Sequence, residues 1–314
     1  MASHDESLLA TVDARTKLAG SNKMEILLFS LGTREIFGIN VFKVREVSQT
    51  PEITKTPNMP FGVEGVISLR GNIIPIIALA KFIGAKDSHE RKYESMIVTE
   101  FNKSTQSFLV DSVDRIIRVA WDKMRAPDNV MSNNTGAQLL ITAVTELDDG
   151  KLVSVLDVEA ILSSVVGETR IPDIQNIGME AEQFIFFVDD SAVARKEITN
   201  VMDKMGVKYH QATNGREAWE KLQAFASRPA PSGELLSNSL QLILVDAEMP
   251  EMDGYVLTRN IKSDRRFSGI PVIMHSSLSS NANRAMGSSV GVDAYVAKFS
   301  PELLADTITQ YLQR

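Results

Sequence analysis

Strand-like apolar runs alternate with helix-like stretches throughout the second half of the chain. From Gln183 onward, FIFFVDD, LQLILVD, IPVIMHSS and AYVAKF each precede a segment of helical character. This alternation predicts βα units that build a parallel sheet, because parallel strands need a crossover between them. The pattern restricts the second half to an α/β fold.

Charged and hydroxyl side chains stand where these predicted strands end, at Asp189 and Asp190, at Asp246, at Ser276 and at Lys298. Ligands of doubly wound sheets bind at this edge, so we expect these groups to converge. Three neighbouring carboxylates stay ionised only beside a compensating cation, and their hard oxygen ligands suit Mg²⁺. With a lysine and a hydroxyl opposite them, the set suits phosphoryl transfer to an aspartate nucleophile.

Each of these residues has a simpler interpretation when it is taken alone. An aspartate at a strand end is more often the N-cap of the next helix, and a lone lysine is more often a solvated surface residue. The complete set at successive strand ends is what favours a phosphorylation site.

Four segments within residues 184–314 resemble a response-regulator receiver domain, namely FFVDDS, LILVDAEMPEMDG, IPVIMHSS and AYVAKFSP. The resemblance implies a flavodoxin-like α/β fold, in which a five-stranded parallel sheet has helices on both faces. It also implies a role for each matching residue: Asp246 as phosphoacceptor; Asp189, Asp190, Asp246 and the main-chain carbonyl of Glu248 as Mg²⁺ ligands; Ser276 as switch hydroxyl; Tyr295 as switch aromatic; and Lys298 as ion-pair partner of the phosphoryl group.

The chain departs from the receiver pattern at three positions. Phe299 follows the lysine where the family usually has proline, Ser276 replaces the commoner threonine, and Glu248 places an acidic side chain beside the acceptor. We expect a different loop after the fifth strand, because a cis bond before a non-proline residue costs about 3 kcal/mol. For Glu248, the hypothesis is an altered phosphoaspartate lifetime, through repulsion or orientation of water.

The first half of the chain has a different sequence pattern, in which short apolar runs are separated by turn residues. EILLFSL, GVISLRG, NIIPIIAL and SFLVDSV are examples between about Met24 and Leu162, and they predict many short strands, as in sandwiches and barrels. Pro75, inside NIIPIIAL, predicts an edge strand or a β-bulge, because proline has no N–H to donate to a ladder.

Residues 20–166 resemble the CheW-like coupling domain of chemotaxis proteins, most strongly in GVISLRGNIIPIIAL. The resemblance implies an all-β fold of two SH3-like barrels, without an active site, that bridges chemoreceptors and the regulatory domain of the histidine kinase CheA. The matching partner-binding positions are Val44, Glu46, Gly65 and Arg70. An arginine in a tight turn presents a fixed fork to a partner carboxylate. The alternative is that these positions are structural: Gly65 would be required only for a turn, and Val44 would be a residue of the hydrophobic core.

Length and composition set the organisation and exclude several classes of function. The 314 residues suit two domains of about 150 residues each. We divide the chain into an N-terminal helix or tail (1–22), a coupling domain (23–166), a linker (167–183) and a receiver domain (184–314). A formal charge of −7 argues against nucleic-acid binding, and the lack of cysteine excludes disulfides and thiolate metal sites. The polar start and the lack of an apolar run of about 18 residues predict a cytoplasmic protein without membrane insertion.

A coupling domain followed by a receiver domain resembles the CheV type of chemotaxis coupling protein. The implied function is a scaffold, not an enzyme, that links methyl-accepting chemoreceptors to CheA at membrane receptor arrays. Phosphorylation of Asp246 by CheA would tune it. One alternative is a phosphate sink that drains the kinase. Another, an aspartyl-phosphate phosphohydrolase, fits less well: its nucleophile follows the first strand whereas Asp246 follows the third, and Glu248 stands where a second aspartate is expected.

Overall fold

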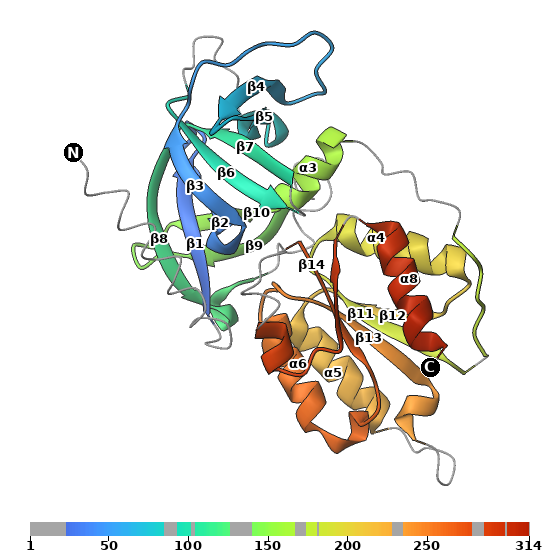
Figure 1. Cartoon of the computed structure of the whole chain (residues 1–314). Helices are drawn as coiled ribbons and strands as arrows, with labels where there is room; N and C mark the ends of the chain where they lie inside the picture. Colours follow the sequence, from blue (N-terminus) through green and yellow to red (C-terminus); the bar gives the residue numbers. More distant parts are fainter. Residues whose placement is uncertain are drawn as a thin grey trace. The chain divides into compact units, whose positions relative to one another are not determined.

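The computed structural model of the chain describes residues 23–84, 93–101, 104–125, 140–166, 174–180, 182–227, 235–277, 286–298 and 300–313. The chain forms two compact units, one from each half of the sequence (Figure 1). The expected N-terminal helix or tail at 1–22 lies outside the described residues, as do Phe299 and part of the expected linker. Among the helices in the described ranges, none has the length and apolar character needed to cross a membrane.

The first unit contains two five-stranded β-sheets. The strands of one lie in the order β8 (Ser112–Ala120), β1 (Lys23–Ser30), β2 (Ile36–Asn40), β10 (Leu152–Leu156) and β9 (Ile141–Glu146). Both β1–β2 and β9–β10 are antiparallel pairs, while β10 runs parallel to β2. Ile26 and Leu28 of β1 belong to one core, and Leu27 and Phe29 belong to another. Burial of both faces explains why the ILLF segment of this strand, residues 26–29, is continuously apolar.

The other sheet has the order β3 (Val44–Gln49), β6 (Ser95–Phe101), β7 (Ser104–Val110), β5 (Asn72–Ala78) and β4 (Val63–Leu69). Its residues Ile77, Ile97 and Phe108 pack in one cluster with Leu27 and Phe29 of the first sheet. The unit also contains α2 (Leu79–Phe82), α3 (Val158–Val166), η2 (Val41–Lys43) and η3 (Trp121–Lys123). The predicted β-rich architecture of this half is confirmed.

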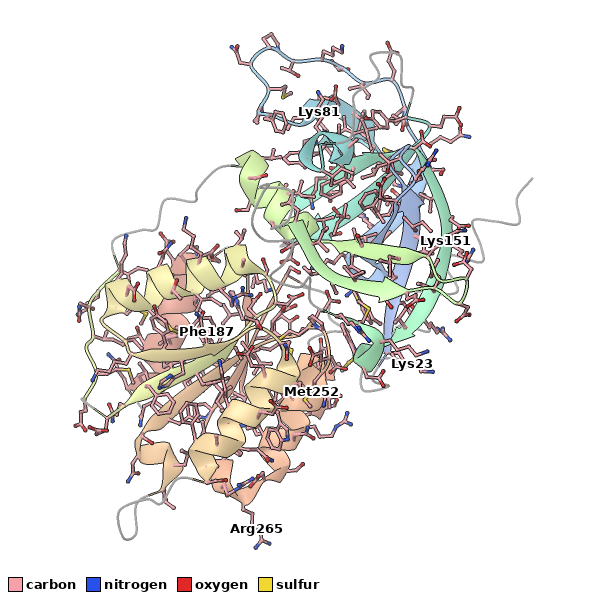
Figure 2. All side chains as sticks on the ribbon, turned by 180° about the vertical axis from the view of Figure 1, so that it is seen from behind. Lys23, Lys81, Lys151, Phe187, Met252 and Arg265 are labelled. Carbon is pink, nitrogen blue, oxygen red and sulfur yellow. The ribbon has the colours of Figure 1, made fainter. Side chains whose placement is uncertain are left out.

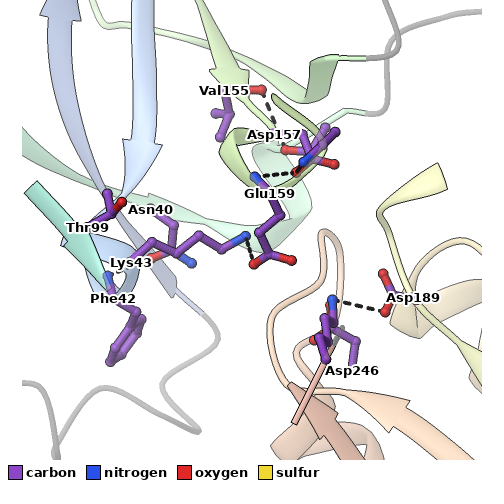
Figure 3. Close-up of polar contacts among 12 residues, drawn as sticks. Asn40, Phe42, Lys43, Thr99, Val155, Asp157, Glu159, Asp189 and Asp246 are labelled. Atoms are coloured by element: carbon purple, nitrogen blue, oxygen red, sulfur yellow. Dashed lines mark hydrogen bonds and ion pairs between the residues drawn. The ribbon is translucent and has the colours of Figure 1, made fainter. Parts of the chain in front are cut away.

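Helix α3 is attached to this unit by a cap and a buried ion pair. The Oδ1 atom of Asp157 accepts the N–H groups of Glu159 and Ala160 at 3.1 and 3.0 Å, which satisfies two of the open donors at the helix start. Glu159 is buried and pairs with Nζ of Lys43 at 2.7 Å (Figure 3). The pair therefore connects α3 to the turn η2.

The prediction of an edge strand at Pro75 is wrong, because β5 lies between β7 and β4. Pro75 faces Val66 of β4, and Val66 exchanges its main-chain hydrogen bonds with Thr54 instead, at 2.9 and 3.0 Å. On the other side, pairing of β5 with β7 begins one residue later. A β-bulge was the other possibility predicted for Pro75. The structure has a shift of register near this residue, in the neighbouring strand β4 between Val63 and Gly65. Proline fits a central strand here because its missing N–H is needed by neither neighbour.

The second unit is one parallel sheet with helices on both faces (Figure 1). Its strands lie in the order β12 (Tyr209–Ala212), β11 (Phe184–Val188), β13 (Leu240–Asp246), β14 (Val272–Ser276) and β15 (Ala294–Ala297). Every neighbouring pair is parallel. This order is the flavodoxin-like one, so the fold predicted for this half is confirmed.

Different helices cover the two faces of this sheet. They are α4 (Ala192–Met205), α5 (Gly215–Ala226), α6 (Gly254–Ser263) and α8 (Pro301–Leu312), with the turns η6 (Leu236–Asn238) and η7 (Arg265–Phe267). Ile185 and Phe187 of β11 pack with α4 and α8, whereas Phe186 and Val188 pack with α5 and α6. Figure 2 shows Phe187 in the interior of the unit. Two buried faces explain the continuously apolar FIFFV run.

Part of the expected linker packs against the second unit. The N–H groups of Ile177 and Gly178 donate to the carbonyl of Met205, the last residue of α4, at 3.0 and 3.2 Å. Ile174, Ile177 and Met179 are half-buried against the core beneath α4 and α8. This stretch therefore satisfies a carbonyl that the end of α4 leaves without a helical partner.

Candidate functional site

The strand ends of the second unit bring the predicted charged residues to one edge of the sheet. Asp189 follows β11, Asp246 ends β13, Ser276 ends β14 and Lys298 follows β15. All four are buried, with at most 3% of their surface exposed. Figure 3 shows Asp189 and Asp246 together at this edge. Parallel strands deliver their carboxyl ends to the same side, so four segments far apart in sequence meet here.

Lys298 bridges the two buried aspartates. Its Nζ atom lies 2.9 Å from Oδ2 of Asp189 and 3.0 Å from Oδ2 of Asp246. Its main-chain N–H donates to the carbonyl of Ser276 at 3.1 Å, which continues the β14–β15 ladder by one residue. Buried charges of opposite sign at this distance compensate one another, and removal of one would leave the others without compensation.

The arrangement of carboxylates suits a divalent cation. Oxygen atoms of Asp189, Asp190 and Asp246 lie within 4.8 Å of one another. Three carboxylates exceed the single positive charge of Lys298, and they offer only hard oxygen ligands. Mg²⁺ is commonly held by a few carboxylates together with water and substrate oxygens. The residues present therefore fit the magnesium site expected from the sequence.

The turn after Asp246 starts a helix directly beside the aspartate. Asp253 caps α6, because its Oδ1 atom accepts the N–H of Val256 at 2.8 Å. A Cβ atom on Gly254 would lie 1.9 Å from the carbonyl oxygen of Asp246, so only glycine allows this approach. Glu248 lies within the same turn and is half-buried. The Asp253 cap and the small Gly254 together allow the start of α6 to pack against the backbone of Asp246.

Tyr295 lies beside the site and belongs to a separate hydrophobic cluster. It is half-buried and packs against Ala247, Tyr255 and Met274. Burial raises the pKa of Tyr255, and the neighbouring phenol of Tyr295 raises it further. The cluster joins the residue after Asp246 to β14 and β15, and the role of Tyr295 as switch aromatic stays a prediction.

Two further titratable residues of this region were not found by sequence reasoning. His275 is 2% exposed, pairs in register with Asp246, and has its Nδ1 atom 4.0 Å from Oδ2 of Asp189. Glu197 occupies the core-facing side of α4, between the buried residues Ala194 and Ile198. The available signals were a histidine directly after the apolar run IPVIM and a glutamate in the apolar stripe of a helix.

We expect Glu197→Gln to stabilise the protein at pH 8 by about 1–3 kcal/mol. Burial raises the pKa of Glu197 from 4.5 to about 7, with a lowering influence of Lys298 and a raising one of Asp189. The folded protein holds this proton more tightly than the unfolded chain does. The contribution of protonated Glu197 to the free energy of unfolding is therefore complete below about pH 4.5 and is lost as the pH rises through about 7. Glutamine stays neutral throughout, so the variant loses nothing over this range.

Urea unfolding in EDTA across this pH range measures the effect. The difference between Glu197→Gln and wild type should shrink toward zero as the pH falls to about 4.5. Glu220→Gln, on the exposed side of α5, is the matched control and should track wild type at every pH. A difference that is the same at pH 5 and pH 8 would contradict the assignment.

The expected partner-binding residues of the first unit fall into two groups. Arg70 is exposed, has a φ of +50° in the β4–β5 turn, and its guanidinium forms an ion pair with the Glu46 carboxylate. Gly65 has a φ of +154°, and a Cβ atom there would lie 2.4 Å from the carbonyl oxygen of Thr54. Val44 is buried in the main core of the unit. Glu46 and Arg70 are therefore accessible to a partner, while Gly65 and Val44 have evident packing roles.

Comparisons with known proteins agree with this division of the chain. Residues 25–166 match the CheW-like domain, and residues 185–309 match the response regulator receiver domain. Chemotaxis protein CheV3 of Helicobacter pylori is 34% identical over 281 residues, which cover 89% of each chain. CheV1 of the same organism is 28% identical over 326 residues, covering 97% of this chain and 98% of that protein. Chemotaxis protein CheW of Klebsiella aerogenes is 35% identical over 159 residues, which cover 50% of this chain and 90% of that one.

A β-rich CheW-like unit joined to a receiver with an acidic pocket defines a chemotaxis coupling scaffold that contains a receiver domain. Three CheV proteins of Helicobacter pylori match over 89–97% of the chain. The chain belongs to the CheV family of chemotaxis proteins.

Proposed function

We propose that Asp246 accepts a phosphoryl group in the presence of Mg²⁺ and that this modification tunes coupling. The observation that supports the proposal is the position of Lys298, whose Nζ atom lies 2.9 and 3.0 Å from the carboxylates of Asp189 and Asp246. Asp189, Asp190, Asp246 and the main-chain carbonyl of Glu248 would hold the cation. When bound, Mg²⁺ would balance charge on the incoming phosphoryl oxygens.

The proposed donor is a phosphohistidine of CheA. A carboxylate oxygen of Asp246 attacks phosphorus, an O–P bond forms, and the P–N bond breaks with its electron pair left on the imidazole nitrogen. Lys298 is already within ion-pair distance of the acceptor, so it can stabilise the developing charge without a large movement. Ser276, at the adjacent strand end, supplies the hydroxyl that donates to the phosphoryl group, and Tyr295 packs beside that strand end.

The CheW-like unit would connect this switch to receptor arrays at the membrane. Its proposed partners are methyl-accepting chemoreceptors and the regulatory domain of CheA. The exposed guanidinium of Arg70 supports a role in partner binding, because it is presented by a tight turn and backed by Glu46. Arginine is among the residue types that most often dominate binding at interfaces.

We expect Arg70→Ala to weaken co-sedimentation with receptor membranes and CheA by about tenfold, as for a strong interfacial arginine. Arg45→Ala is the matched control, because Arg45 is also an exposed arginine, on β3, and pairs with Glu100 at 3.1 Å. It should bind like wild type. Equal losses in both variants would remove Arg70 from the proposed interface.

The same assay separates a tuned scaffold from a phosphate sink. A tuned scaffold binds receptor membranes with a different affinity once Asp246 is phosphorylated. A sink accepts the phosphoryl group but shows the same co-sedimentation with and without phosphodonor. An unchanged affinity would therefore reject tuning while leaving phosphorylation itself intact.

Removal of the Glu248 carboxylate should change the dephosphorylation rate of Asp246 several-fold, because a half-buried charge lies two residues from the acceptor. Faster hydrolysis in Glu248→Gln would show that the carboxylate repels the attacking hydroxide or water. Slower hydrolysis would show that it orients the water. Loss of label from phosphorylated protein over time measures the rate, and equal rates in wild type, Glu248→Gln and Glu248→Ala would reject the hypothesis.

A further inference from the structure

Arg195 of α4 binds the backbone that carries the two adjacent aspartates of the site. Its Nη1 atom donates to the carbonyl oxygen of Asp189 at 2.8 Å and to that of Asp190 at 2.9 Å. This nitrogen has two N–H groups, one for each carbonyl. The side chain is half-buried, so it reaches back from the second turn of α4 to the segment that precedes the helix.

The segment that Arg195 contacts lies between two regular elements. The strand β11 ends at Val188 and α4 begins at Ala192, so Asp189 and Asp190 are members of neither. The N–H of Asp189 donates to Ala212 of β12 at a long 3.4 Å. The direction of both carboxylates depends on this short connection, because a rotation of its peptide planes would turn the side chains away from Asp246.

We propose that Arg195 is a positioning residue of the cation site, which holds the main chain of Asp189 and Asp190 in the conformation that directs their carboxylates toward Asp246. The inference rests on the proposed function, since it assumes that this pocket binds Mg²⁺. Groups that orient metal ligands through hydrogen bonds commonly change metal affinity by about 10–100-fold when they are removed. Arg195 performs this role through main-chain carbonyls, so the carboxylate oxygens stay available to the ion.

Removal of Arg195 would change Mg²⁺ affinity in two opposite ways, through its charge and through its two hydrogen bonds to the main chain. A guanidinium opposes cation binding through its positive charge, so its loss on charge grounds alone would strengthen Mg²⁺ binding. Loss of positioning would weaken binding instead. The neighbouring Lys196 offers a matched comparison, because it is an exposed cation one residue further along the same helix.

The test is isothermal titration of the full chain with Mg²⁺ alone, in wild type, Arg195→Met, Arg195→Lys and Lys196→Met. We expect Arg195→Met to raise the Kd for Mg²⁺ by about tenfold. Arg195→Lys should recover part of the affinity, because an ammonium group still has donors for both carbonyls. Lys196→Met should bind as tightly as wild type or slightly more tightly. Thermal unfolding in EDTA checks that the variants are folded, and Arg195→Gln takes the place of Arg195→Met if the latter is not.

The outcomes separate this inference from the function on which it rests. An Mg²⁺ affinity in Arg195→Met and Arg195→Gln equal to that of wild type would overturn the positioning role while the cation site stands. Equal weakening in Arg195→Met and Lys196→Met would overturn it too, because a general effect on α4 would then explain the loss. Failure of wild type to bind Mg²⁺ would reject the cation site of the proposed function, and the role of Arg195 with it.

Discussion

Asp246→Asn should abolish transfer of the phosphoryl group from phosphorylated CheA in the presence of Mg²⁺. Asparagine has almost the same shape as aspartate, so the packing around the 3%-exposed side chain is retained. Its amide has no anionic oxygen to attack phosphorus. It also removes one of the two carboxylates that contact Lys298 and one of the three that would hold the cation. The experiment uses a labelled phosphoryl group on CheA. We expect none of this label on Asp246→Asn under conditions in which wild type becomes fully labelled.

Asp253→Asn is the matched control for that experiment. Asp253 is also a buried aspartate of the turn behind β13, but its carboxylate caps α6 through the N–H of Val256. Asparagine is an equally good N-cap, so this variant should accept label as wild type does. Label on Asp246→Asn would place the acceptor elsewhere. No label on wild type would reject phosphorylation of the receiver by CheA.

Lys298→Met should lower the free energy of unfolding of the metal-free protein by about 3–5 kcal/mol, the loss typical when one partner of a buried ion pair is removed. Methionine fills much of the lysine volume but leaves Asp189 and Asp246 without the ammonium group between them. Two buried carboxylates then repel each other and must take up a proton or unfold. Urea unfolding in EDTA at neutral pH measures the loss.

Mg²⁺ should restore part of the stability of Lys298→Met, because the cation replaces the missing positive charge. A ligand that binds only the folded state adds about 2.7 kcal/mol at a concentration of 100 times its Kd. Lys262→Met is the matched control: Lys262 is more exposed and pairs with Asp293, so we expect a loss of about 1 kcal/mol or less without rescue by Mg²⁺. Equal losses in the two variants would contradict the charge balance proposed for the pocket.

Much of this architecture follows from local sequence pattern. Apolar runs separated by helical stretches predicted the parallel sheet, and a residue at each strand end predicted which groups share one edge. Asp189, Asp246 and Lys298 meet there because a strand only a few residues long must deliver its last residue to the carboxyl edge. The close approach of Gly254 to the Asp246 carbonyl, in contrast, is visible only in the folded chain.

Other features depend on contacts that no local pattern records. Pro75 was expected on an edge strand or at a β-bulge, but the order of strands is set by pairing between distant segments, which places its strand inside the sheet, close to a bulge in β4. The sequence left open whether Val44 and Gly65 bind a partner or have structural roles, and the contacts with the core and with Thr54 show the structural roles. A strand or turn can be inferred from its own residues, whereas its neighbours cannot.

The acidic site shows most clearly which features local sequence predicts and which depend on tertiary contacts. The order of residues along the chain is sufficient to predict that Asp189, Asp190, Asp246 and Lys298 meet, because parallel strands place their carboxyl ends at the same edge of the sheet. The contributions of Arg195, Glu197 and His275 needed the folded chain. The sequence held a signal for Glu197 and His275 but none for Arg195, and only the packing of α4 and β14 shows that all three side chains lie beside the acidic residues.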